Sequence, residues 1–397
     1  MRKAHPRASF CSCLIALAAC LVWQAQPTTA QSDQSKAVDA PAFHEYDPPS
    51  TLIVPATELK AAKFPFVDVH NHQWQMPDAD MAAVAREMDA LNMAVMVNLS
   101  GRGFTRAKNA DGSFRLAYQE RGFLKRAIDN GEKHASGRFL VFSNLDTTGL
   151  GEPGWRQRTL DMLRQDAANG AAGLKIYKGL GLDQVDVDGR RIAVDDERLA
   201  PVWQLCGELR LPVLIHTGEP ASFWLPKDGS NERLLEMMEK PERWRGEPGA
   251  FPAFEDLLAE QHRLFERHPE TIFINAHFGW LANDLARLGR LLDRFPNVYV
   301  EFGAVIAELG RQPRFGRRFM VEHQDRVLFG KDTWRPEEYS LYFRVLETDD
   351  DYIKYFRPRH AFWRLYGLAL PDSVLRKIYY ENALRIFPQI DRSRFPG

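Results

Sequence analysis

Two histidines separated by one residue follow a short apolar run in this chain. The stretch reads FVDVHNHQW over residues 66–74, and its histidines are His70 and His72. An imidazole pair at the end of a buried strand gains little from packing. Neutral imidazole is, however, a common ligand for zinc and related divalent cations. The spacing therefore suggests a cation beyond the end of this strand.

Three further residues of metal-ligand type stand at or just after other β-rich runs. His216 ends VLIH, His277 ends IFINAH, and Asp332 comes two residues after VLFG. A single histidine at a strand end is more often a hydrogen-bonded structural residue than a ligand. Four histidines and an aspartate in matching positions instead predict a divalent cation site, because imidazole and carboxylate together are typical of such sites.

A lysine occupies the corresponding β-rich run GLKIY. An unmodified ammonium group at Lys175, beside a dication, would suffer both desolvation and repulsion. If Lys175 points toward the predicted site, we expect it to be modified, to be deprotonated, or to contact an anionic substrate.

The elements that must position these residues alternate from residue 64 onward. Short β-rich runs cover residues 66–70, 94–99, 139–144, 173–177, 213–216, 272–277, 298–302 and 327–330. Helical patterns lie between or after them, at residues 80–91, 155–168, 196–209, 254–268, 282–294 and 373–387. This alternation predicts an α/β fold, a (β/α)8 TIM barrel, with a doubly wound open sheet as the alternative. The barrel is favoured because its strand ends meet at one face, where they can share a site.

The two-residue period of a strand predicts which side chains enter the barrel. In the first run, Asp68 and His70 share one face, and the valines between them share the other. The same rule places Asn275 and His277 inside the barrel and Ile274 toward the helices. The polar set of each strand should therefore face the site.

Composition limits the classes of function. The chain has 397 residues, a formal net charge of −1 and 45% hydrophobic residues. This near-neutral balance gives no support to nucleic-acid or membrane-surface binding driven by bulk charge. We expect a small-molecule substrate and no nucleic-acid partner.

The N-terminus has the pattern of an export signal. Basic residues precede an apolar stretch at residues 10–23, which is too short for a comfortable membrane span, so residues 1–30 read as a signal peptide. A lipobox pattern ends at Cys20 and offers lipid anchoring as the alternative. Residues 31–60 read as an extension or tether, and residues 61–390 as one domain. We expect the bacterial periplasm or a lipid-anchored envelope location, and no further membrane span.

The ordered motifs resemble the amidohydrolase superfamily, and within it the amidohydrolase-related group that includes aminocarboxymuconate-semialdehyde decarboxylase. The resemblance covers about residues 64–390. It rests on FVDVHNH, AAGLKIY, LPVLIHTGEP, HPETIFINAHFGW, FPNVYVEFGA, RVLFGKDTW and YYENALRIF. It implies a single-domain TIM barrel with a metal-dependent enzyme site, and a homo-oligomer is compatible with it.

Roles for the strand-end residues follow from the resemblance. It implies that His70 and His72 are first-strand ligands and that His216 is the fifth-strand ligand. Asp332 would complete the metal shell and shuttle protons. His277 would bind a second metal or orient substrate and water.

The resemblance leaves the number of metals open at Lys175. In binuclear members a carboxylated fourth-strand lysine bridges two metals, whereas in the amidohydrolase-related group one metal usually suffices. We expect one ion, zinc with manganese as the alternative. The loop Gly330-Lys331-Asp332-Thr333-Trp334 keeps the aspartate of the group and departs from its flanking residues.

The chemistry expected from this site is metal-dependent hydrolysis of an amide, ester or lactone. Many decarboxylases of the group carry an acidic residue in place of one first-strand histidine, and the intact His-x-His favours hydrolysis. A metal-dependent decarboxylase and a non-catalytic envelope binding protein are the alternatives.

Loops after the strands should shape the substrate pocket. Arg102 and Lys178 lie closest to strand ends, and Glu219 and Trp224 begin the insertion at residues 219–252. Basic and aromatic residues in such loops suit a carboxylate-bearing small molecule.

Overall fold

The computed structural model describes residues 41–108, 114–118 and 122–396, with only the backbone described over most of residues 104–117. The chain divides into two units, Met1–Pro48 and Pro49–Gly397. In the first unit, the described residues contain one short 3₁₀ helix, η1 (Phe43–Glu45). The predicted signal peptide, its Cys20 and residues 31–40 lie outside the described residues, so export stays a prediction.

The second unit is built on eight parallel strands in the order β1-β2-β5-β6-β7-β8-β9-β10. The backbone N–H of Val69 in β1 donates to the carbonyl of Phe329, just after β10, at 2.9 Å, so the sheet is nearly closed. This confirms the predicted barrel. The strands are β1 (Phe66–Asn71), β2 (Met93–Asn98), β5 (Phe139–Asn144), β6 (Gly173–Ile176), β7 (Val213–Ile215), β8 (Phe273–Asn275), β9 (Val298–Glu301) and β10 (Val327–Leu328).

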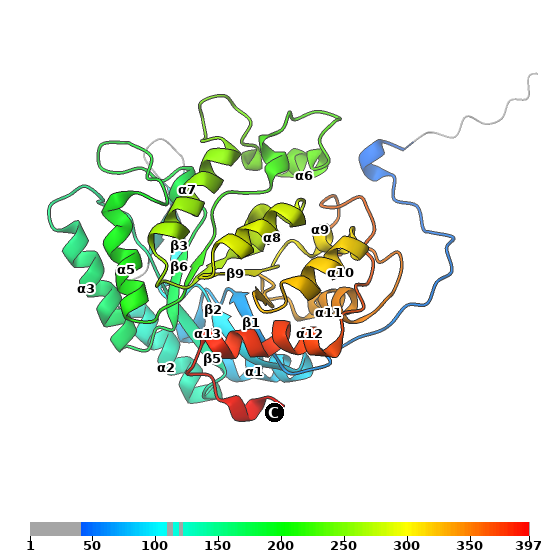
Figure 1. The fold of residues 1–397 in the computed structure, drawn as a ribbon, viewed down its shortest axis with the longest axis horizontal. Coiled ribbons are helices and arrows are strands. Elements are labelled where there is room, and N and C mark those ends of the chain that lie inside the picture. Colours follow the sequence, from blue (N-terminus) through cyan, green and yellow to red (C-terminus); the bar gives the residue numbers. More distant parts are fainter. Residues whose placement is uncertain (1–40, 109–113, 119–121, 397) are drawn as a thin grey trace, which may run out of the picture. The chain divides into compact units, whose positions relative to one another are not determined.

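Helices surround the strands, and Figure 1 shows several of them outside the sheet. The α-helices are α1 (Met81–Ala90), α2 (Phe123–Ala135), α3 (Trp155–Ala168), α4 (Gly179–Leu182), α5 (Ala200–Glu208), α6 (Leu234–Glu239), α7 (Phe254–Arg267), α8 (Leu285–Arg294), α9 (Ile306–Gly310), α10 (Pro313–Glu322), α11 (Tyr339–Glu347), α12 (Asp372–Arg376) and α13 (Asn382–Ile386). A π-helical turn, η8 (Lys377–Glu381), joins α12 to α13. None of the helices among the described residues is long and apolar enough to cross a membrane.

The strands are apolar because both of their faces are covered. All six residues of β1 are buried, as expected for a parallel strand between the barrel interior and the helices. The terminal helical segment fixes β10, since the backbone N–H of Phe329 donates to the carbonyl of Ile378 at 3.1 Å. The Asn382 amide donates to the carbonyl of Val327 at 2.7 Å. The terminal helical segment thus holds the last barrel strand, β10, in place.

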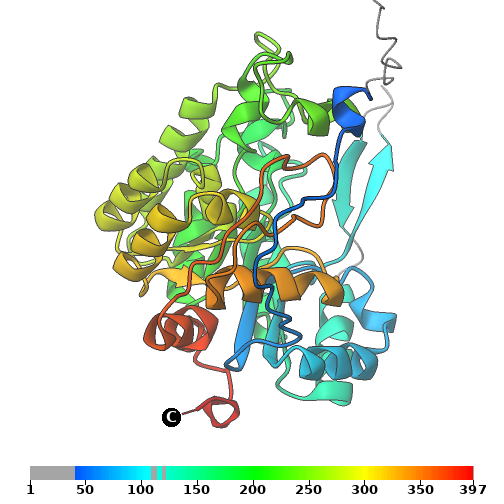
Figure 2. The same cartoon turned by 90° about the vertical axis from the view of Figure 1, so that its right-hand side faces the viewer.

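One segment expected to be a loop contains regular structure. After β2 the chain forms an antiparallel hairpin of β3 (Phe104–Lys108) and β4 (Phe114–Tyr118). Figure 2 shows this cyan hairpin standing off the barrel strands at the upper right of the view.

The predicted inward orientation of Asn275 is wrong. Its side chain exchanges two hydrogen bonds with Gln261 of α7, at 2.8 and 3.1 Å, so it faces the helical layer. Phe273, two residues earlier, likewise packs on Phe265 of α7, with ring centroids 5.0 Å apart. The strand alternation ends at Asn275, and a left-handed turn carries His277 into the barrel instead. The turn spans η6 (Ala276–Trp280), with φ near +56° at His277.

Candidate metal centre

His70 presents one ring nitrogen to the barrel mouth and uses the other for orientation. Its Nδ1 lies 2.8 Å from Oε1 of Glu301, so Nδ1–H donates to the carboxylate. In the neutral ring, Nε2 then keeps its lone pair. This Nε2 is buried, has no hydrogen-bond partner among the described residues, and lies 3.3 Å from Oδ1 of Asp332.

His72 is oriented by a chain of hydroxyl groups. Its Nδ1 lies 2.6 Å from Oγ of Ser100, which lies 3.3 Å from the hydroxyl of Tyr177. The Tyr177 hydroxyl donates to the carbonyl of Leu99 at 3.1 Å. Because Tyr177 donates to Leu99, Ser100 can donate to Tyr177 and accept from Nδ1–H of His72. Its Nε2 therefore has a free lone pair, 3.6 Å from Oδ1 of Asp332.

His216 and His277 form a pair with a defined direction. Nδ1 of His277 lies 2.6 Å from the carbonyl of Gly303 and must donate to it. Nε2 of His277 is then the acceptor for Nδ1–H of His216, at 3.3 Å. This leaves Nε2 of His216 with a lone pair, and that atom is buried without a hydrogen-bond partner among the described residues. His277 therefore positions His216.

Asp332 follows β10 and has a strained backbone that is hydrogen-bonded to β1. Its φ is +88°, and its N–H donates to the carbonyl of His70 at 2.7 Å. Burial opposes ionisation, but the surrounding imidazoles of His70, His277 and His72 hold the pKa of Asp332 well below its usual value. Asp332 is thus an ionised carboxylate beside two free imidazole nitrogens.

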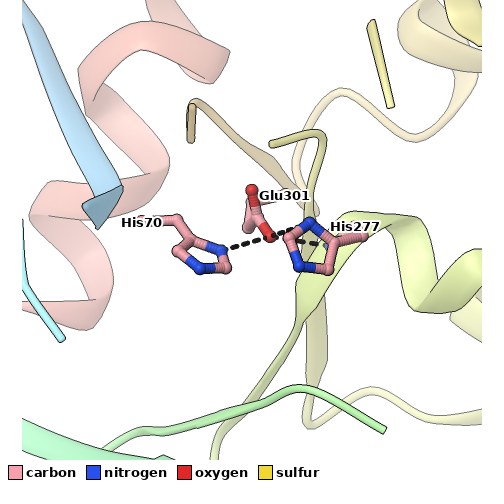
Figure 3. A group of neighbouring side chains, drawn as sticks. All are labelled: His70, His277 and Glu301. Atoms are coloured by element: carbon pink, nitrogen blue, oxygen red, sulfur yellow. Dashed lines mark hydrogen bonds and ion pairs between the residues drawn. The ribbon is translucent and has the colours of Figure 1, made fainter. Parts of the chain in front are cut away.

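Glu301, at the end of β9, organises this group and was missed from the sequence. Its Oε1 accepts from Nδ1 of His70 and, at 2.7 Å, from the backbone N–H of His277; its Oε2 accepts from the N–H of Gly303 at 2.6 Å. Figure 3 shows the carboxylate between the two imidazole rings. Burial raises the pKa of Glu301, but the neighbouring imidazole of His70 and these hydrogen bonds lower it to about 2. An acidic residue at the end of an apolar strand was the available signal.

Two overlapping groups have atoms close enough together to hold a metal ion. One comprises His70, His277 and Glu301, and the other His70, His72 and Asp332. In the first group the Glu301 oxygens and Nδ1 of His277 already take part in short hydrogen bonds. In the second group the two Nε2 atoms keep free lone pairs and face an ionised carboxylate. The second group therefore fits a divalent cation, and Glu301 orients the candidate ligand His70 from behind.

Lys175 also reaches this region. Its side chain is completely buried, and Nζ has no hydrogen-bond partner among the described residues. Burial lowers the pKa of Lys175 to about 8, while the charges of Asp332 and Glu301 act in the opposite direction. The neighbours of Lys175 thus do not fix whether its amine is protonated.

Two cavities meet at the predicted ligands. An outer cavity of about 690 Å³ is lined by His72, Trp74, Tyr177, Trp334 and, at its junction with the inner one, by Lys178, His216 and Asp332. The inner cavity, of about 100 Å³, continues from these three residues past His277 and Glu219. The site therefore lies between an aromatic outer space and a charged inner space.

The predicted substrate residues have different positions. Lys178 forms an ion pair with Glu219 at 2.5 Å, and both line the inner cavity. Trp224 lines neither cavity; its Nε1–H donates to the carbonyl of Pro252 at 2.9 Å. Arg102 is buried beside Asn144, whose side-chain oxygen accepts from the Arg102 backbone N–H at 3.0 Å. The structure brings Lys178 and Glu219 to the site, but not Trp224 or Arg102.

Solved structures with a similar fold include several enzymes. The dihydroxybenzoic acid decarboxylase of Polaromonas sp. JS666, with bound manganese and 2-nitroresorcinol, has a TM-score of 0.50 at 14% identity, covering 83% of this chain and 99% of that one. The 2,6-dihydroxybenzoate decarboxylase of Rhizobium has a TM-score of 0.48 at 15% identity, covering 82% and 99%. An amidohydrolase of Burkholderia multivorans with bound zinc has a TM-score of 0.46 at 15% identity, also covering 82% and 99%. At such identities the likeness concerns the fold alone.

Sequence comparison gives a more direct result. No match was found among curated protein sequences. The profile of the Amidohydrolase family matches residues 67–389, which is the whole barrel from β1 to α13. Since this match spans far more than half of the chain, the protein belongs to the amidohydrolase family.

Proposed function

We propose that the protein is a metal-dependent hydrolase that cleaves an amide, ester or lactone bond in a small carboxylate-bearing molecule. One observation carries this proposal. The Nδ1 atoms of His70, His72 and His216 are hydrogen-bonded to Glu301, Ser100 and His277 in that order. Their Nε2 lone pairs are therefore available near the ionised Asp332.

His70, His72 and Asp332 would hold the cation, and His216 would complete its ligand set from the shared edge of the two cavities. Imidazole and carboxylate ligands suit zinc, and manganese is the alternative. A bound divalent cation would supply Lewis-acid polarisation of the scissile carbonyl and a lowered pKa for water. The network of Glu301 fits this role, because a carboxylate behind a ligand histidine fixes its orientation and raises its basicity.

Asp332 is the residue we assign to proton transfer. Its low pKa keeps the carboxylate ionised at neutral pH, so it can accept a proton from the attacking water. The same oxygen can then return that proton to the leaving amine or alkoxide. Lys178 and Glu219 form an ion pair beside this site, with Arg245 3.6 Å from the same carboxylate.

The experiment uses zinc-loaded protein with a panel of amides, esters, lactones and aromatic carboxylic acids. Hydrolysis predicts incorporation of one ¹⁸O atom from labelled water into the product acid, with no carbon dioxide released. The Asp332→Asn variant should lose activity by about 10²–10⁴-fold, since it keeps the shape and removes the proton acceptor. Carbon dioxide release without ¹⁸O incorporation would replace this proposal with the decarboxylase alternative. Turnover unaffected by Asp332→Asn would contradict the role of Asp332.

Export is proposed on the N-terminal sequence pattern alone. Mass spectrometry of the protein from its native envelope should find a chain that begins near residue 31 or at a lipidated Cys20. An unprocessed chain in the cytoplasmic fraction would contradict export.

A further inference from the structure

The inner cavity contains more basic groups than the proposed hydrolysis uses. It is lined by Lys178, Arg233, Arg243 and Arg357, together with the acidic residues Glu219, Glu236 and Asp332. It reaches the site at His216 and Asp332, so a molecule bound there would lie beside the reacting groups.

All but one of these cations have a carboxylate partner. Lys178 pairs with Glu219 at 2.5 Å. Arg233 donates to Glu236 at 2.7 Å and also contacts Glu308, and Arg243 contacts Glu236 as well. Each of these three cations is therefore engaged by a carboxylate.

His360 adds no charge to this cavity. Its Nε2 accepts from Nη1 of Arg233 at 2.8 Å, and its Nδ1 lies 3.2 Å from Oε1 of Glu236 and donates to it. Both ring nitrogens are therefore used by a neutral imidazole. Burial is the main reason that the pKa of His360 falls to about 4, which agrees with this assignment.

Arg357 is the exception. Its half-buried side chain lines the cavity, yet no hydrogen bond or ion pair joins it to another residue in the part of the chain that the structure describes. Nearby, Tyr355 has a buried hydroxyl that also has no hydrogen-bond partner among the described residues. Burial lowers the pKa of Arg357, but Tyr355, Tyr342, Asp332 and Glu338 raise it overall, so the guanidinium is charged. The guanidinium lies 5.6 Å from the ring centroid of Phe356, but a partly desolvated cation without an anionic partner is costly.

We propose that Arg357 binds a carboxylate of the substrate and fixes its anionic end in the inner cavity. This inference rests on the proposed function, because it places the reacting carbonyl beside Asp332. One unpaired positive charge suits one carboxylate, and the planar guanidinium matches it with two parallel hydrogen bonds. The inner cavity, of about 100 Å³, is much smaller than the outer one of about 690 Å³, so it suits a carboxylate on a short spacer. The preferred substrates are therefore those whose carboxylate lies a short aliphatic spacer from the scissile carbonyl.

Succinate and butyrate test this proposal, because they have the same chain length and differ by one carboxylate. Calorimetry on zinc-loaded and on EDTA-treated protein gives the Kd of each acid. We expect zinc-loaded wild-type protein to bind succinate about tenfold more tightly than butyrate, as one charge-assisted contact implies. Arg357→Gln should remove the preference, and Arg357→Lys should keep part of it. Arg359→Gln is the matched control, since Arg359 is in the same loop, is exposed and pairs with Glu239 at 3.2 Å.

Equal affinities of the wild-type protein for the two acids would overturn the proposal. A preference that persists in Arg357→Gln, with a normal circular dichroism spectrum, would overturn it as well. The zinc content of the same samples reports on the proposed function separately. If zinc does not bind, the metal-dependent function fails; affinity of EDTA-treated protein for either acid that is lost in Arg357→Gln would still support the anion site, and affinity unchanged in that variant would overturn it.

Discussion

At the scale of single residues, the hydrogen bond that each histidine makes through Nδ1 determines how its ring is oriented in the site. Glu301, Ser100 and Gly303 bind the Nδ1 atoms of His70, His72 and His277. Each contact selects one tautomer and one ring orientation. The free lone pairs are consequences of these contacts, so the residues behind the predicted ligands matter almost as much as the ligands.

Glu301→Gln tests this point. The amide oxygen can still accept a hydrogen bond, but the negative charge that supports His70 is lost. We expect zinc affinity to fall by about 10–100-fold, measured by competition with a chelator. Glu255→Gln is the control, because Glu255 is exposed and pairs with Arg287 at 2.6 Å. Unchanged zinc affinity in Glu301→Gln would reduce Glu301 to a purely structural residue.

The sequence identified the strand-end histidines and Asp332 as candidates because residue type and spacing are visible in it. It did not identify Glu301, since one glutamate after VYV resembles any exposed residue at the end of a strand. Arg357 lies in an irregular segment far from any motif, and its lack of a partner is visible only in three dimensions. The metal-ligand roles themselves stay predictions.

At the scale of elements, two strained turns present the site. His277, Phe278 and Trp280 have φ values between 55° and 58°, and Asp332 has φ of 88°. Left-handed backbone costs roughly 1–2 kcal/mol for each non-glycine residue. Glu301 accepts from the N–H of His277 and so stabilises the turn after β8. The strand alternation holds through Asn275 and is broken after it by this turn, which no periodicity in the sequence indicates.

Gly330→Ala tests the packing of the turn after β10. A Cβ atom at Gly330 would lie 2.3 Å from Oε2 of Glu301 and 3.0 Å from Cβ of His70, so the carboxylate must move. We expect weaker zinc binding and a loss of about 1–3 kcal/mol in the free energy of unfolding. Gly229→Ala should change neither quantity, since no atom lies within 4 Å of the added Cβ. Wild-type zinc affinity in Gly330→Ala would show that the site tolerates displacement of Glu301.

At the scale of the whole molecule, the barrel could be predicted because its signals are repeated. Eight β-rich runs and the helical patterns between them mark the elements, and the eight parallel strands follow the predicted order. The hairpin β3–β4 and the charged insertion at residues 219–252 could not be predicted in the same way. They belong to single loops, whose conformation depends on contacts distant in sequence.

Acid stability is another property of the whole fold. His360 is neutral when folded, with a pKa of about 4 against 6.5 for the free side chain. On acidification the unfolded chain takes up this proton first, so stability falls as the pH drops from 6.5 toward 4. His360 alone should account for roughly 2 kcal/mol between pH 7 and pH 5. Urea unfolding of EDTA-treated protein at both pH values should show a smaller loss in His360→Gln, and an equal loss would contradict the assignment.

The most direct test of the account is the zinc content of the purified chain, measured by mass spectrometry after reconstitution. We predict about one zinc per chain in the wild type and in the control His134→Ala, whose histidine is exposed on α2. His70→Ala and Asp332→Ala should lose it. Two ions per chain would indicate that Lys175 is a carboxylated bridge between them. Absence of both zinc and manganese from correctly folded wild-type protein would contradict the metal centre and, with it, the proposed hydrolase.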